Sequence, residues 1–182
     1  MKKSIQQVVL FLSMLVTSVC APVPNNEAKT GIAELDNIIE TALYGSRDDL
    51  TALIDFTETI CTHVEGLGGP PKCLSGESEG ATVDVLPFLG PEGSFIRKTD
   101  IEGWEGLKLS KLYSVYQNSE TVYSDQNYPA GEYAIVFIGS DDLGAVTLQI
   151  RSGKIIRIDY GIGIPPVILD SNVKKFLLKP PP

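Results

Sequence analysis

The fold is decided by residues 145–160, Ala145-Val-Thr-Leu-Gln-Ile-Arg-Ser-Gly-Lys-Ile-Ile-Arg-Ile-Asp-Tyr160, because two runs of strand-forming residues flank a Ser-Gly turn there. The pattern predicts a β-hairpin with strands at 145–150 and 154–160. We expect a three-residue loop with Gly153 in the left-handed conformation, since this loop gives the hairpin one apolar face. A two-residue Ser-Gly turn would mix the two faces, which a half-buried sheet resists. The expected apolar face comprises Val146, Leu148, Ile150, Ile156 and Ile158.

More strands are predicted upstream of this hairpin. Residues 107–117 and 133–139 are rich in Val, Ile, Tyr and Phe and are bounded by turn residues, which is typical of strands. Residues 133–138 are apolar throughout, so we expect that strand to be central and covered on both faces. The alternation in 82–86 predicts one further strand, which Pro87 would end.

The region before the sheet is predicted to form two helices. Apolar residues from Ile32 to Leu43 recur at helical spacing, and Gly45 follows in the position of a left-handed C-terminal cap. Ser46 and Asp49 have the spacing of a capping box for the second helix. Because the link is so short, the two helices should be antiparallel. The second helix would bury Leu50, Leu53, Ile54 and Ile60.

The expected fold class is α+β, with an N-terminal antiparallel helix pair packed on a curved, mainly antiparallel four- to five-stranded sheet. A helix of one or two turns is expected at 99–104, where Thr99 and Glu102 have capping-box spacing. A short capping helix is expected near the C-terminus, around Val173, Phe176 and Leu177.

The helical opening resembles the NTF2-like superfamily of cone-shaped α+β domains. The likeness is carried by Ile38-Ile-Glu-Thr-Ala-Leu-Tyr-Gly-Ser46 and Asp49-Leu-Thr-Ala-Leu53. This chain departs from the family pattern in that Gly45 is followed by Ser-Arg-Asp-Asp and not directly by Asp. The resemblance implies two helices before a strongly curved sheet. That superfamily includes enzymes and binding modules, so the likeness does not choose between them.

Three further runs carry a second resemblance: Phe56-Thr-Glu-Thr-Ile-Cys61, Gly66-Leu-Gly-Gly-Pro-Pro-Lys-Cys73 and Val85-Leu-Pro-Phe-Leu-Gly-Pro-Glu-Gly93. In these runs the chain resembles a group of uncharacterised bacterial exported proteins. This resemblance implies export and brings no activity.

The N-terminal residues also indicate export. Lys2 and Lys3 precede an apolar run from Val8 to Val16 and small residues before Cys20, which is the order of an export signal. The run is too short for a membrane span, which needs about 20 apolar residues. We therefore divide the chain into an export signal at 1–20, a flexible tether at 21–30 and a single α+β domain at 31–182.

Cys20 lies where a bacterial lipoprotein carries its lipid, and we expect lipidation there. Val19 occupies a position where such signals have Gly, Ala or Ser, so ordinary signal peptidase cutting after Cys20 is the alternative. Residues 1–20 hold two lysines and no acidic residue, so their removal changes the net charge from −8 to −10. Anionic lipids repel an acidic surface, and membrane attachment would come only through a lipid on Cys20.

The composition excludes several classes of function. A net charge of −8 argues against nucleic-acid binding, which requires a basic surface to neutralise phosphates. A single histidine removes most histidine-rich metal sites and makes a histidine-dependent triad improbable. The sequence contains no phosphate-binding loop, nucleophile elbow or metal-binding helix motif, so we expect no cofactor and no metal.

Cys61 and Cys73 are predicted to form a disulfide, because an isolated pair in an exported protein is most simply oxidised. The bond would close a loop rich in glycine and proline and would stabilise the fold by roughly 3 kcal/mol. The alternative is a metal site of Cys61, His63 and Cys73. The two cysteines are spaced more widely than the usual zinc-binding pairs, which disfavours this alternative.

Few side chains could support catalysis or ligand binding. His63 with Glu65 is a candidate imidazole–carboxylate pair, and Asp84 is a further candidate acid. The alternatives are an exposed loop histidine and an outward-facing strand residue. Three aromatic residues are candidate ligand contacts, although each also fits a place in the core: Trp104, Tyr116 and Tyr133.

We expect a non-enzymatic extracytoplasmic protein, secreted or lipid-anchored at the cell envelope. It would bind a small apolar ligand or an exported protein partner, and no nucleic acid. The alternative is an NTF2-like cone-pocket enzyme, a lyase, isomerase or hydrolase, that acts on a small apolar substrate. A hollow space between helices and sheet would favour the enzyme, whereas a filled one would favour the binding domain.

Overall fold

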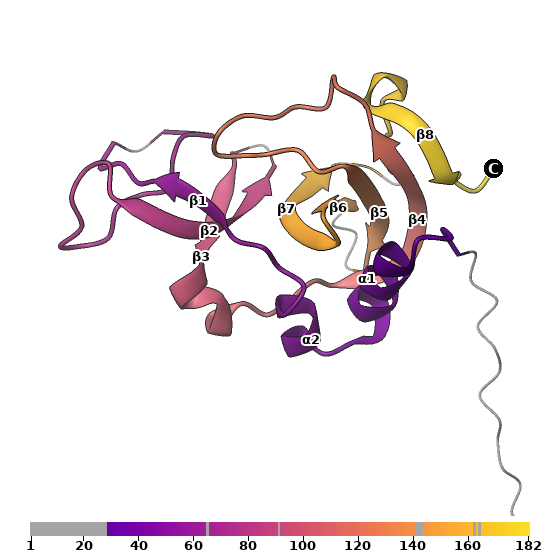
Figure 1. Ribbon diagram of the computed structural model, residues 1–182, viewed down its shortest axis with the longest axis horizontal. Helices are drawn as coiled ribbons and strands as arrows, with labels where there is room; N and C mark the ends of the chain where they lie inside the picture. The colour runs from indigo at the N-terminus through magenta and orange to yellow at the C-terminus, as the bar shows by residue number, and fades with distance from the viewer. Residues whose placement is uncertain (1–28, 65, 91, 141–143, 162, 164) are drawn as a thin grey trace, which may run out of the picture.

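A computed structural model of the chain describes residues 29–64, 66–90, 92–140, 144–161, 163 and 165–182 (Figure 1). The predicted export signal at 1–20, its Cys20 and most of the predicted tether lie outside the described residues, as does Glu65. No helix among the described residues is long and apolar enough to cross a membrane.

The described part of the chain is built mainly from one eight-stranded mixed sheet, in the order β1-β2-β7-β6-β5-β4-β8, with β3 paired to β2 outside this path. The helical elements are α1 (Ala33–Tyr44), α2 (Arg47–Thr51) and the 3₁₀ segments η1 (Lys98–Gly103) and η2 (Asp170–Asn172). The strands are β1 (Thr57–Ile60), β2 (Thr82–Leu89), β3 (Ser94–Arg97), β4 (Leu109–Asn118), β5 (Tyr133–Gly139), β6 (Ala145–Arg151), β7 (Lys154–Gly161) and β8 (Val173–Leu178).

The helical part is smaller and the sheet larger than the sequence predicted. Ser46 and Asp49 do form the capping box, but α2 ends at Thr51. Residues 57–60, Thr-Glu-Thr-Ile, form β1 instead, because β-branched residues suit a strand better than a helix. The fold remains α+β, but the prediction of a helix pair packed on a four- to five-stranded sheet is wrong. Gly45 is also extended after α1, not left-handed.

The curved sheet encloses the main core together with α1. In Figure 1, β4 to β7 curl around the centre of the molecule, with α1 against them and α2 below. The apolar stripe of α1 buries Leu35, Ile38 and Ile39 against residues such as Ile135 and Phe137 of β5. Burial of this stripe explains why the helical spacing of the sequence predicts α1 well. The space between α1 and the sheet is filled with packed side chains.

The β6–β7 hairpin uses a two-residue turn, so the predicted three-residue loop is wrong. Arg151 pairs with Lys154, and both turn residues are left-handed, with φ of 50° at Ser152 and 70° at Gly153. A bulge in β7 follows, where Ile150 pairs with Ile155 but Gln149 pairs with Arg157. The extra residue restores the alternation, so the core face contains Ile155 where Ile156 was expected.

Two further differences have local causes. β2 continues through Pro87 to Leu89, because β2 changes neighbour there: β1 pairs with residues 82–85 and β7 with residues 88 and 89. A missing N–H is tolerated at such a gap. The predicted C-terminal capping helix is instead β8, which pairs antiparallel with β4. Its Phe176 packs edge-on against Tyr116 of β4.

Candidate functional site

A groove of about 730 Å³ lies between the end of the disulfide loop (residues 61–74) and two consecutive segments that begin about twenty residues later, β3 and η1. We call it the Trp104 groove. One side is the end of the disulfide loop, the floor is β3, and the other side is η1 with the residues that follow it. The side chains used below are Pro71, Lys72, Leu74, Phe95, Ile96, Arg97, Asp100, Trp104 and Glu105.

The disulfide predicted from the sequence is present and shapes the first side. Cys61 and Cys73 are joined with an S–S distance of 2.01 Å and Cα atoms 4.9 Å apart. The Thr62 N–H donates to the Pro71 carbonyl, and the Cys73 N–H donates to the Thr62 carbonyl. These bonds hold the two ends of a glycine- and proline-rich loop side by side.

An ion pair fastens the disulfide loop to β3. The Arg97 guanidinium binds both carboxylate oxygens of Glu77, at 2.7 and 2.8 Å, and also donates to the Lys72 carbonyl at 2.7 Å. The Arg97 side chain is only 11% exposed, so water screens this pair less than a surface pair. Its hydrogen bonds are the main cause that holds the pKa of Glu77 below its usual value, with the Leu74 N–H adding to the effect.

Trp104 lines the opposite side of the groove, and contacts with β2 and α2 hold it in place. Its ring packs edge-on against Phe88 of β2, with ring centroids 6.1 Å apart. The η1 segment before it is tied to α2, since Arg47 Nη1 donates to the Glu102 carbonyl at 2.7 Å. Trp104 is half-buried and remains within reach of a ligand in the groove.

The floor of the groove is the edge of a strand. Among the described residues β3 pairs with β2 alone, and β1 and β7 lie on the far side of β2. Phe95 joins a small cluster with Cys61, Cys73 and Val85, whereas Ile96 packs on the main core. The groove therefore touches side chains that point to both faces of the sheet.

The candidate catalytic residues do not come together at this groove. His63 is exposed on the disulfide loop, and its neighbour is Glu79, which accepts its backbone N–H at 2.5 Å. Asp84 is exposed on β2 and lies 3.6 Å from Lys98 Nζ. Neither is among the described residues that line the groove.

Two clusters have the spacing of metal ligands, and both depend on the bridged cysteines. They combine Cys73 with Cys61 and Glu77, or with His63 and Glu79, with ligand atoms within 4.8 Å of one another. Sulfur in a disulfide is not a thiolate and is a poor metal ligand, so neither cluster has three ligands available.

The two candidate tyrosines lie away from the Trp104 groove. Tyr116 is buried on β4, where burial and then the charge of Asp159 raise the pKa of its phenol to about 12. Tyr133 begins β5 and packs at the border of the main core. Trp104 is thus the one residue of the three candidates that lines the groove.

A buried arginine lies on the sheet face opposite the main core, and the sequence did not predict its burial. Arg157 of β7 is 1% exposed and forms an ion pair with Asp159, Nε to Oδ1 at 2.6 Å. The covering loop (residues 119–132) lies over it, and Arg157 Nη1 donates to three carbonyls of that loop, those of Tyr123, Tyr128 and Pro129. The arginine thus binds the loop to the sheet.

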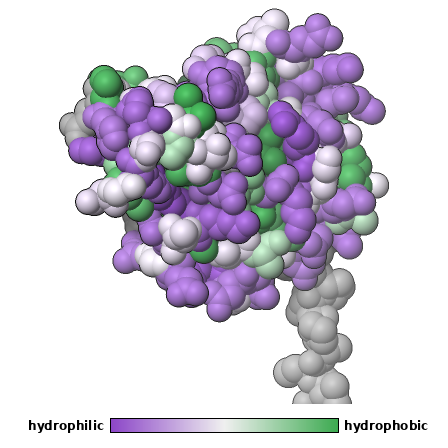
Figure 2. Space-filling view, turned by 60° about the vertical axis from the view of Figure 1, so that its left-hand side comes forward, coloured by the Kyte–Doolittle hydropathy of each residue, from purple (hydrophilic) through white to green (hydrophobic). Residues whose placement is uncertain are grey.

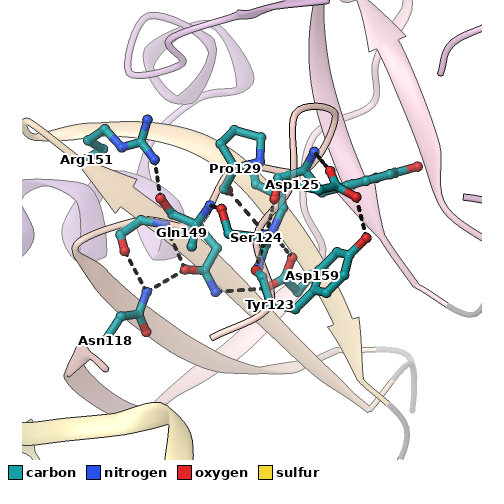
Figure 3. Close-up of polar contacts among 12 residues, drawn as sticks. Asn118, Tyr123, Ser124, Asp125, Pro129, Gln149, Arg151 and Asp159 are labelled. Carbon is teal, nitrogen blue, oxygen red and sulfur yellow. Dashed lines mark hydrogen bonds and ion pairs between the residues drawn. The ribbon is translucent and has the colours of Figure 1, made fainter. Parts of the chain in front are cut away.

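Two amides extend this network across the sheet. Gln149 donates to Asp159 at 2.8 Å, and Asn118 donates to Gln149 at 2.7 Å (Figure 3). The network reaches the Trp104 groove through Tyr128 of the covering loop, whose ring lies against Phe95 with centroids 5.0 Å apart. We interpret the network as the support that holds the floor of the groove.

Comparison with known proteins adds no relative, because no family model, curated protein or solved structure matches the chain. The resemblances to NTF2-like domains and to bacterial exported proteins therefore stay predictions.

Proposed function

We propose that the protein is a non-enzymatic extracytoplasmic binding domain and that the Trp104 groove is its binding site. The observation that carries this proposal is that the chain's single tryptophan lines an open groove whose other side, the disulfide loop, is fixed by a disulfide and by a partly buried ion pair to β3. An aromatic surface on a rigid frame binds a ligand with little loss of conformational entropy.

The packing of the interior supports binding over catalysis. A cone-pocket enzyme needs a hollow between its helices and its sheet, and this space is occupied by the side chains of α1 and β5. The candidate bases His63 and Asp84 are both exposed and belong to different segments. A catalytic base must lie within hydrogen-bond reach of its substrate, and neither lines the groove.

A protein partner fits the groove better than a small apolar ligand does. Charged side chains from both sides, Lys72 on one and Asp100 and Glu105 on the other, stand beside the apolar ones. Figure 2, which turns the left side of Figure 1 forward, shows hydrophobic areas separated by hydrophilic residues. Mixed surfaces of this kind are typical of protein interfaces.

The disulfide is compatible with an extracytoplasmic location, since such bonds persist in oxidising compartments. We propose further that Cys20 carries a lipid anchor. Labelling cells with a fatty acid should mark the wild-type protein but not Cys20→Ala. An unlabelled wild-type protein would show that Cys20 carries no lipid anchor.

Trp104 fluorescence tests the binding function, because no other tryptophan contributes to the signal. We expect saturable changes in emission with a set of short peptides, and with Nile red if small apolar ligands also enter. Leu74→Ser, which alters the groove, should weaken binding about fivefold, as expected for the loss of one apolar contact.

Leu67→Ser is the matched control, since Leu67 belongs to the same loop and is 79% exposed but does not line the groove. Its affinity for every probe should equal that of the wild type. The proposal is wrong if no probe changes the emission, or if the two leucine variants weaken binding equally.

A further inference from the structure

We propose that the ligand of the Trp104 groove is an extended peptide that pairs with the free edge of β3 as an added strand. Its side chains would alternate, with basic residues toward Trp104 and apolar residues toward Leu74. This inference rests on the proposed function and specifies the class of ligand.

The first argument is the course of the groove along β3. Successive side chains of a strand point to opposite faces, and here Phe95 and Ile96 join different apolar clusters. A groove on one face would touch every second residue. This groove touches Phe95, Ile96 and Arg97 in succession, so it follows the edge of the strand, where the backbone is accessible.

The second argument is that the edge is unprotected. Edge strands are commonly blocked by proline, by lysine or by a charged side chain that prevents pairing. β3 has the sequence Ser-Phe-Ile-Arg, and its one charge, on Arg97, is bound to Glu77 and to the Lys72 carbonyl. Every second residue of an edge strand directs its N–H and C=O outward, and another extended chain is the ligand that matches both groups.

The third argument is that the two sides of the groove differ in chemistry. The Trp104 side carries the carboxylates of Asp100 and Glu105, and neither makes an ion pair with a described residue. An aromatic ring beside carboxylates attracts a guanidinium or ammonium group. The other side offers Pro71 and Leu74, which favour apolar side chains, and its one charged residue, Lys72, repels a basic side chain.

These two sides of the groove favour a peptide in which two kinds of residue alternate. In an added strand, alternate side chains would face the Trp104 side and the disulfide-loop side. A peptide in which basic and apolar residues alternate satisfies both. A second copy of this chain fits less well, because its own β3 presents Phe and Ile and its net charge is −8. Charge complementarity therefore favours a basic segment of another protein.

The test uses a capped, dye-labelled peptide in which arginine and valine alternate, with binding measured by fluorescence anisotropy. Two analogues carry N-methyl groups on alternate residues, and the residues methylated in one analogue are those left free in the other. We call these two sets of positions the two frames. N-methylation in the frame that faces β3 should weaken binding at least about tenfold, because it removes donors to the strand edge. The other frame should bind within about twofold of the parent peptide, and glutamate in place of arginine should abolish binding.

Protein variants test the charged side. The double variant Asp100→Asn/Glu105→Gln should weaken binding about fivefold, the expected sum of two exposed ion pairs. The control is Glu40→Gln/Glu120→Gln, which removes the same charge at two exposed positions outside the groove and should change affinity less than about twofold. Hydrogen exchange should show slower exchange of outward amides in β3 when the peptide is bound.

The outcomes separate this inference from the proposed function. If the peptide binds but both N-methyl frames behave alike, strand addition is wrong while the groove remains a binding site. If the edge pairs with a second copy, sedimentation will show a dimer that the Arg-Val peptide does not dissociate, and the peptide proposal fails. If no probe of any class reaches Trp104, the proposed function fails as well.

Discussion

Arg97 on β3 and Glu77 beyond the disulfide loop form a two-pronged ion pair that joins β3 to the chain just after Leu74. The same arginine donates to the Lys72 carbonyl, and the same carboxylate accepts the Leu74 N–H at 2.7 Å. These two side chains thus hold the backbone at Lys72 and Leu74 close to β3. Lys72 and Leu74 both line the Trp104 groove, so this contact holds one of its sides in place.

Acidification should loosen this contact. Because hydrogen bonds from Arg97 and from Leu74 lower the pKa of Glu77 in the folded protein, its contribution to stability is complete above the ordinary value of 4.5 and is lost as the pH falls through the lowered pKa. Amides near Lys72 and Leu74 should therefore shift and exchange faster only below pH 4.5 in an NMR titration. In Glu77→Gln this transition should be missing, and an identical titration in that variant would contradict the assignment.

Reduction of the disulfide should destabilise the protein and disorganise the groove. Closure of the loop between Cys61 and Cys73 stabilises the fold by about 3 kcal/mol in the loop-entropy account. Urea unfolding with and without a reductant measures this difference, and mass spectrometry confirms the loss of two hydrogen atoms in the oxidised form. Cys61→Ser/Cys73→Ser should match the reduced protein. Equal stability in both states would mean that the loop is held by its other contacts.

Loss of the buried arginine should be costly. Arg157→Met removes the arginine's hydrogen bonds to three carbonyls of the covering loop and leaves Asp159 without its charged partner, for a loss of about 3 kcal/mol in the free energy of unfolding. Arg151→Met is the matched control, because Arg151 also donates to that loop, at Ala130, but is exposed. Its cost should be under about 1 kcal/mol. Similar losses in denaturant unfolding would show that burial is not the cause.

Gly93 should not tolerate a side chain. Its φ is +66°, and a Cβ there would collide with the Tyr128 hydroxyl, so Gly93→Ala should suffer strain and overpacking. Gly76→Ala is the control with backbone strain alone, since φ is +91° and the space is open. Gly93→Ala should lower the free energy of unfolding by about 1–3 kcal/mol more than Gly76→Ala does. Tyr128→Phe removes a buried hydroxyl without a partner among the described residues and should relieve the collision in the double variant.

The periodic features of the sequence predicted much of the fold. The apolar stripe gives α1, and the apolar runs give β4, β5, β6 and β7 close to their expected bounds, because burial on one or both faces determines each pattern. The disulfide followed from the number and spacing of the cysteines. The hairpin register did not follow, since a bulge at Ile155 and Ile156 corrects the faces in a way that alternation alone does not reveal.

The groove could be predicted only through Trp104. Its floor and sides come from segments near residues 72, 96 and 104, and β1 and β3 are too short to give a clear periodic signal. Arg157 is next to Ile158 of the expected apolar face, so strand alternation directs it to the opposite face, where a charged residue is usually exposed. The covering loop buries it, and that contact spans about thirty residues of sequence.

The most direct test of the account is the indole N–H resonance of Trp104 in a ¹H–¹⁵N spectrum during titration with the Arg-Val peptide. This resonance is unique because the chain has one tryptophan. The account predicts that it shifts saturably together with the amides of Leu74, Phe95 and Ile96, while amides of α1 stay in place. Binding that leaves the Trp104 resonance unchanged, or that shifts residues outside the groove instead, would contradict the account.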